Sequence, residues 1–256
     1  MIITESKLRK IIRDILLERT IGPHTKKIRA AASSLGILPP SPGRHYNDPD
    51  DPVRNIIKAY SSLTEEEKDW WHGWYEHAHE DMKEIKDNVK NETGVDVPLN
   101  VVCAVTAIFS PGCEWERNIL GAQSYLIWKL TGGEGESPFK PVYSQKENLA
   151  KADNAIKTME SGEDPSIFAT GPKVAPFYKS LLDPKGTKDL LVADRHVLNL
   201  WRGHRVEDKN TIGKKLRERI IDDFKKASQE IYKNTGKLVP LQDLQAATWF
   251  VWQHLD

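Results

Sequence analysis

Hydrophobic residues recur along this 256-residue chain at the three- and four-residue spacing of amphipathic helices, and no segment shows the sustained alternation of a strand ladder. Thr64 and Glu67 match a capping box at the start of a long helix that we expect to run to about Asn91. Residues 98–109 are nearly all apolar, which predicts a central helix buried on most of its sides. Ser110-Pro111-Gly112 ends that helix. The pattern predicts an all-α fold.

The same pattern divides the chain into three regions. Residues 1–20 contain a predicted amphipathic helix. Residues 21–95 are predicted to be a helical extension with a proline-rich linker at 37–52, which is the best candidate for a domain boundary. Residues 96–256 are the predicted main helical domain. Further helices are expected at 114–130, 146–160, 171–183, 189–203, 211–234 and 240–254.

Composition and charge narrow the class of protein. With 39% hydrophobic residues and eight tryptophans, the chain can bury a large core and should be globular. Its 37 basic and 37 acidic residues cancel, so the overall field does not steer it toward a polyanion. Basic residues cluster between Arg202 and Arg219, but acidic residues interleave with them and favour a solvated helix surface. Two cysteines, no secretory signal and no bilayer-length apolar run predict a cytoplasmic protein without membrane contact.

The strongest candidate chemistry lies in two short segments. Gly171-Pro172-Lys173 forms a turn that opens a helix, and Asp194 occupies the N-cap of the following predicted helix. A carboxylate held beside a lysine suits nucleophilic or acid–base chemistry on an electron-poor carbon. Both segments are also ordinary ways to start a helix, and residue types alone favour that structural interpretation.

Two other places in the sequence carry side chains that can bind a metal or act as a nucleophile. His72, Glu76 and His79 share one face of a helix, as metal ligands can, but no other metal motif accompanies them. An ordinary polar helix face is the favoured interpretation, so neither a metal nor a cofactor is expected. Cys113 lies at a helix N-terminus, where the dipole lowers the pKa of a thiol, although no histidine partner is identified.

Aromatic and polar residues near these segments offer binding functions. Trp70, Trp71, Trp74 and Tyr75 could stack on bases, but their helical spacing favours packing in the core. The helix start after Ser110 places Glu114, Glu116, Arg117 and Asn118 together, and its backbone amides suit a phosphate. Gln245 precedes Trp249 by one helical turn, which suits a pocket wall as well as core packing.

Residues 98–252 resemble the helix-hairpin-helix DNA glycosylase superfamily. Residues 167–175 match the hairpin and its lysine, and residues 193–197 match the aspartate segment. Ala169 replaces the first hairpin glycine, Phe168 replaces the proline, and the four-cysteine cluster of many members is absent. The resemblance implies a helix-hairpin-helix glycosylase-like bundle in which Asp194 is the essential carboxylate and Lys173 the lyase nucleophile. It also implies double-stranded DNA as partner, with contacts from Thr170, Gly171, Arg195, His196, Arg117, Asn118 and Gln245.

The N-terminus resembles a different group. Residues 3–18 look like leader helices on proteins of large tailed phages, and Leu16-Leu17-Glu18 looks like a site for their capsid-maturation proteases. This resemblance implies packaging in a phage head through the N-terminal helix, whereas a terminal helix docked on the domain explains the pattern equally well. The predicted function is excision of a flipped, modified or damaged base. The alternatives are a virion protein without catalysis and an enzyme of DNA base hypermodification.

Overall fold

The computed structural model describes residues 51–142, 144–204 and 212–253. The chain divides into one unit of residues 1–42 and a second of residues 43–256, and all described residues belong to the second. The predicted N-terminal helix, its protease site and most of the proline-rich linker lie outside the described residues.

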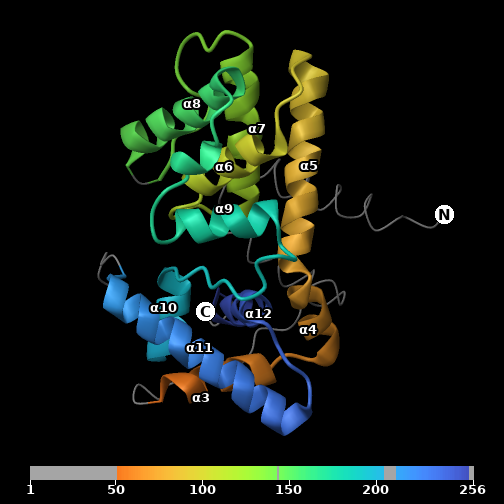
Figure 1. The fold of residues 1–256 in the computed structure, drawn as a ribbon, viewed down its shortest axis with the longest axis vertical. Coiled ribbons are helices and arrows are strands. Elements are labelled where there is room, and N and C mark those ends of the chain that lie inside the picture. The colour runs from red at the N-terminus through yellow and green to blue at the C-terminus, as the bar shows by residue number, and fades with distance from the viewer. Residues whose placement is uncertain (1–50, 143, 205–211, 254–256) are drawn as a thin grey trace, which may run out of the picture. The chain divides into compact units, whose positions relative to one another are not determined.

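The described residues form ten α-helices and one short 3-10 helix, with no strand among them, which confirms the predicted all-α class (Figure 1). The elements are α3 (Pro52–Ser61), α4 (Glu65–His72), α5 (Trp74–Thr93), α6 (Leu99–Phe109), α7 (Trp115–Leu130), α8 (Gln145–Ser161), η1 (Pro165–Ile167), α9 (Val174–Leu182), α10 (Arg195–Arg202), α11 (Lys214–Thr235) and α12 (Leu241–Gln253).

Three boundaries differ from the sequence predictions. The long helix expected from Thr64 is interrupted at Gly73, which ends α4 and precedes α5. Helix α3 was not predicted, because its first residue, Pro52, was assigned to the linker. Asp51 accepts a hydrogen bond from the Arg54 amide and Pro52 takes the first helical position, a common helix start. Helix α10 begins only after Asp194, whose backbone is extended.

The first core, which we call the contiguous half, surrounds α6. Every residue from Val101 to Phe109 is buried, as the apolar run predicted. Helices α5, α7, α8 and α9 enclose α6 (Figure 1). One face of α5 contributes Tyr75, Ala78, Met82 and Ile85, as the helical spacing predicted. Apart from Val192 and Ala246, the buried residues of this core come from one continuous stretch of chain, residues 75–181.

The second core, which we call the split half, joins two distant stretches of chain. Helices α3 and α4 pack against α10, α11 and α12 (Figure 1). Residues 52–72, predicted to belong to an extension, therefore lie in the same compact unit as the predicted main domain. Trp74 and α5 contact both cores and join them.

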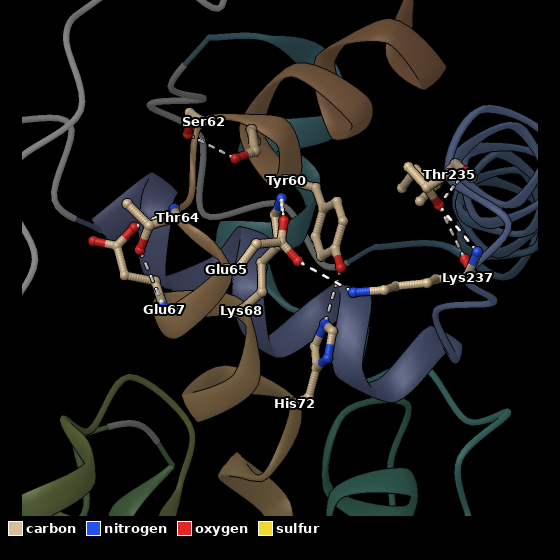
Figure 2. A network of polar contacts seen from close by, with 11 residues as sticks. Tyr60, Ser62, Thr64, Glu65, Glu67, Lys68, His72, Thr235 and Lys237 are labelled. Atoms are coloured by element: carbon tan, nitrogen blue, oxygen red, sulfur yellow. Dashed lines mark hydrogen bonds and ion pairs between the residues drawn. The ribbon is translucent and has the colours of Figure 1, made fainter.

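Polar contacts fix the corner between α3 and α4 (Figure 2). The predicted capping box is present: the Thr64 amide donates to Glu67 Oε2 at 2.7 Å, and the Glu67 amide donates to Thr64 Oγ1 at 3.2 Å. Lys237, in the loop after α11, reaches Glu65 at 3.5 Å. The Lys237–Glu65 ion pair joins the loop after α11 to the first turn of α4. Within the described residues, no helix has the length and apolar content needed to cross a membrane.

Candidate functional site

The candidate site begins at the turn between η1 and α9. The Thr170 amide donates to the Phe168 carbonyl at 2.9 Å, and the Ala175 amide donates to the Gly171 carbonyl at 3.1 Å. Gly171 has a φ of 110°, a conformation that residues with a side chain rarely adopt. The turn therefore requires its glycine, and it places Lys173 immediately before the first residue of α9.

The Lys173 side chain points inward from the start of α9. Its Nζ donates to the Ser110 carbonyl, 3.1 Å away at the C-terminal end of α6. Burial lowers the pKa of the Lys173 amine, and the opposing charge of Asp194 only partly offsets that shift. A larger share of this amine is therefore neutral near physiological pH than for an ordinary lysine.

Asp194 begins α10, as its predicted N-cap role requires. Its Oδ1 accepts hydrogen bonds from the His196 amide at 2.9 Å and the Val197 amide at 3.0 Å. Both bonds use the same oxygen, so the cap does not use Oδ2. The carboxylate charge also acts on Lys173 and on Tyr75. The fold thus brings together the two residues that the sequence singled out.

Tyr75 and Gln245 form a buried pair beside these groups. The Tyr75 hydroxyl donates to Gln245 Oε1 at 2.7 Å. Burial, with the nearby charges of Asp194 and Asp243, raises the pKa of Tyr75 well above its usual value, so the hydroxyl stays protonated. Because Oε1 accepts from Tyr75, the orientation of the Gln245 amide is defined.

Aromatic rings from both halves meet around Trp74. The Trp74 ring lies 5.2 Å from Trp115, 6.1 Å from Trp249 and 6.5 Å from Phe177, measured between centroids. Trp249 also contacts the His196 ring edge to face at 5.9 Å. The tryptophans here and His196 are only half-buried. Of the four aromatic residues predicted to pack in the core, Trp71 and Tyr75 are buried. The prediction is wrong for Trp70, which is 42% exposed.

The remaining predicted DNA contacts lie in different environments. Thr170, Arg195 and Arg117 are exposed, and Arg117 Nη2 donates to the Lys140 carbonyl at 3.5 Å. Asn118 is 1% exposed, and its Nδ2 donates to the Thr106 carbonyl at 3.0 Å. Its amide therefore lies between α6 and α7, in the interior of the contiguous half.

Cys113 does not have the activated thiol that its position suggested. It is half-buried near Lys173, and burial raises the pKa of the thiol. Desolvation of the thiolate outweighs the attraction of Arg117 and Lys173. The expected lowering of this pKa is therefore wrong, and Cys113 carries less thiolate than an exposed cysteine at the same pH.

His72, Glu76 and His79 have separate partners. His72 Nε2 lies 3.1 Å from the Tyr60 hydroxyl, whose pKa burial raises to about 12. His79 Nδ1 lies 2.7 Å from the Leu181 carbonyl, and Glu76 pairs with Lys188 at 2.8 Å. Across the described parts of the chain, no group of three or more metal-binding side chains is placed to hold an ion.

One feature of the site carries no local sequence signal. Lys188 Nζ lies 2.7 Å from Asp243 Oδ1 as well as 2.8 Å from Glu76 Oε1. We call this cluster the Lys188 triad. Its members come from α5, from the segment between α9 and α10, and from α12. Because these residues are far apart in the chain, only the folded structure brings them together.

Comparison with known proteins returns one relationship. The profile of a family of unknown function, DUF7178, matches residues 45–255. The chain belongs to DUF7178. No curated protein and no solved structure gives a significant match to the chain. For this DUF7178 member, the glycosylase resemblance therefore rests on the residues of its own sequence.

Proposed function

We propose that this protein is a DNA glycosylase-like enzyme that cleaves the N-glycosidic bond of a modified or damaged base flipped out of the duplex. The observation that carries the proposal is that Asp194 lies near enough to Lys173 for its charge to act on the lysine amine. An amine with a lowered pKa and a carboxylate held on a helix N-terminus are brought together from separate helices. Perturbed pKa values cluster at functional sites, because catalytic groups need pKa values matched to their role.

The chemistry assigns a different role to each group. As the bond between C1′ and the base breaks, the base leaves with the bonding electron pair and positive charge develops on the sugar. The Asp194 carboxylate stabilises that charge and orients a water whose oxygen bonds to C1′, and the proton of that water passes by way of the carboxylate to the departing base anion. In the lyase variant, the neutral Lys173 amine bonds to C1′ instead and gives up a proton. The C1′–O4′ ring bond then breaks, O4′ takes up a proton, and the C1′=N bond of a protonated Schiff base forms.

The aromatic cluster supports recognition of a flipped base. Half-buried Trp74, Trp115 and Trp249 offer ring surface, and Trp249 contacts His196, which follows Asp194 by two residues. Stacking of a base on an aromatic ring contributes about 1 to 3 kcal/mol, which helps to offset unstacking from the duplex. The exposed turn at Thr170 and Gly171, with helix N-terminal amides behind it, suits contact with a DNA phosphate.

Excision assays test the proposal. Purified protein is incubated with duplexes that carry a panel of modified, damaged and mismatched bases, and abasic sites are scored. We expect excision of at least one base and a loss of about 100-fold or more in Asp194→Asn, which retains a helix-capping side chain. Asp164→Asn is the matched control, because Asp164 caps η1 beside the same turn through the Ser166 amide. Equal activity of the two variants would contradict the mechanism.

Borohydride trapping tests Lys173 separately. If the parent protein forms a covalent adduct and Lys173→Gln does not, Lys173 is the Schiff-base nucleophile. Lys179→Gln is the control and should still form the adduct, because Lys179 is an exposed lysine of α9. Only the neutral amine attacks, so the rate of trapping should rise with pH, with a midpoint below that of an ordinary lysine. Excision without an adduct identifies the water mechanism.

The other functions are distinguished by the same panel. No excision from any duplex, together with recovery of the chain from purified phage particles, would favour a virion protein without catalysis. Transfer of a group to the base, detected by mass spectrometry of the nucleosides, would favour hypermodification. Binding to double-stranded DNA by the parent protein is expected in the glycosylase case and is measured by a mobility shift.

A further inference from the structure

We propose that Lys188, held between Glu76 and Asp243, is a positioning residue that fixes Asp194 beside Lys173. The inference rests on the proposed function only in naming these two groups as the reacting ones. Its evidence is the geometry of residues 183–194, the connecting segment between α9 and α10. Figure 1 shows this segment running from α9 past α5 and α12 to α10.

The connecting segment crosses from one core to the other. Lys173 begins α9, which packs in the contiguous half, whereas Asp194 begins α10, which packs in the split half. Just before Asp194, Val192 packs in the contiguous core, and its neighbours Leu191 and Ala193 pack in the split core. The distance between Lys173 and Asp194 therefore depends on which contacts fix the connecting segment in place.

The Lys188 triad holds the crossing at its centre. Lys188 Nζ bridges Glu76 of α5 and Asp243 of α12, at 2.8 Å and 2.7 Å. Asp243 is only 9% exposed, so its charge is poorly solvated and depends on the lysine. Lys188 is thus bonded to both helices against which the connecting segment lies.

Two further hydrogen bonds attach the same part of the segment to α12. The Gln242 amide donates to the Lys188 carbonyl, and Gln242 Nε2 donates to Thr187 Oγ1, both at 3.0 Å. Gln242 is fully buried, whereas Thr187 and Lys188 are half-buried. Two consecutive residues of the segment, Thr187 and Lys188, therefore contact two consecutive residues of α12.

The position of Asp194 has a readout that does not need catalysis. The Asp194 charge raises the pKa of Lys173, in opposition to burial. Any direct effect of the Lys188 cation on that amine would be repulsive and would lower the pKa. Loss of a nearby cation would raise the pKa of Lys173, whereas displacement of Asp194 would lower it. The two effects have opposite signs, which separates positioning from a direct charge effect.

The test is an NMR titration of the full chain labelled with carbon-13 at the lysine ε-position, with Lys173 assigned from Lys173→Arg. We expect Lys188→Met to lower the Lys173 midpoint by about half a pH unit or more, in the same direction as Asp194→Asn. In the Asp194→Asn background, Lys188→Met should add no further shift. Lys129→Met is the matched control. Lys129 pairs with Asp153 at 2.9 Å, and its side chain is exposed to an extent similar to that of Lys188. Lys129 is also distant in the sequence from the connecting segment.

An unchanged or raised Lys173 midpoint in folded Lys188→Met would overturn the inference. If that variant does not fold, Thr187→Val removes the Gln242 contact without unpairing a charge, and a lowered midpoint is again required. The outcome is independent of excision: a protein that removes no base can still show the shift. Where excision is detected, Lys188→Met should lower kcat with little change in KM, and Lys188→Arg should restore part of it.

Discussion

The contiguous half and the split half differ in how the chain builds them. Residues 74–182 supply almost all of the core around α6, so its contacts are largely local. The split half needs residues 52–72 and residues 195–253 to come together, with the whole contiguous half between them in the sequence. Bringing residues 72 and 195 together from an unfolded chain would close a long loop and cost conformational entropy. If the contiguous half is already folded, most of that entropy has been lost before the split half forms. The split half should therefore depend on the contiguous half more than the reverse.

The largest expected effect comes from removing one fully buried phenylalanine from each core. Phe109→Ala in α6 and Phe224→Ala in α11 should each cost about 3 to 5 kcal/mol of unfolding free energy. Hydrogen exchange followed by mass spectrometry separates the halves. We expect Phe224→Ala to increase exchange mainly in α3, α4 and α10–α12, and Phe109→Ala to increase it in both halves. If the two substitutions increased hydrogen exchange equally in both halves, the split half would not depend on the contiguous half more than the reverse.

The next effect concerns the ion pairs. Lys188→Met should cost roughly 2 kcal/mol, because it leaves Asp243 buried without its cation. Lys129→Met, which breaks a pair within the contiguous half, should cost about 1 kcal/mol or less. Burial already raises the pKa of Asp243, so protonation at low pH removes the unpaired charge. The loss in Lys188→Met should thus shrink as pH falls through that pKa, measured by denaturant titration at several pH values.

A smaller effect comes from the turn before α9. Gly171→Ala should cost about 1 to 2 kcal/mol, because a φ of 110° strains any residue with a side chain. Gly132→Ala is a matched control: its φ is 111°, and neither glycine has an atom within 4 Å of an added Cβ. Thermal melts should show similar losses for the two. Only Gly171→Ala should weaken DNA binding. If both variants bound DNA equally well, the turn at Gly171 would not be part of the DNA-binding surface.

The smallest effect separates the capping role of Asp194 from its chemical role. Asp194→Ala should cost about 1 kcal/mol, since the His196 and Val197 amides lose their acceptor. Asp194→Asn keeps a capping oxygen and should change stability by a few tenths of that. Chemical denaturation measures both. A large loss in Asp194→Asn would mean that its charge stabilises the fold, and the excision assay would then no longer isolate chemistry.

Local signals in the sequence predicted much of the fold. The apolar run at 98–109, the capping box at Thr64 and the aspartate cap at Asp194 are short-range features, and each is present. Helix α3 was missed because Pro52 was assigned to the linker, although Pro at a first helical position is common. Gly73 was passed over because one glycine does not show whether a helix will tolerate or break at it.

In the candidate site, too, some features follow from the local sequence and others from the folded structure. The sequence by itself determined which residues start α9 and α10, because the glycine turn and the aspartate cap act through their own backbone neighbours. Only the tertiary structure decided that half-buried Lys173 contacts the Ser110 carbonyl, that Cys113 is not activated and that Tyr75 contacts Gln245. Burial and charge depend on helices that are distant in the chain. The Lys188 triad, built from residues 76, 188 and 243, arises only when both halves close.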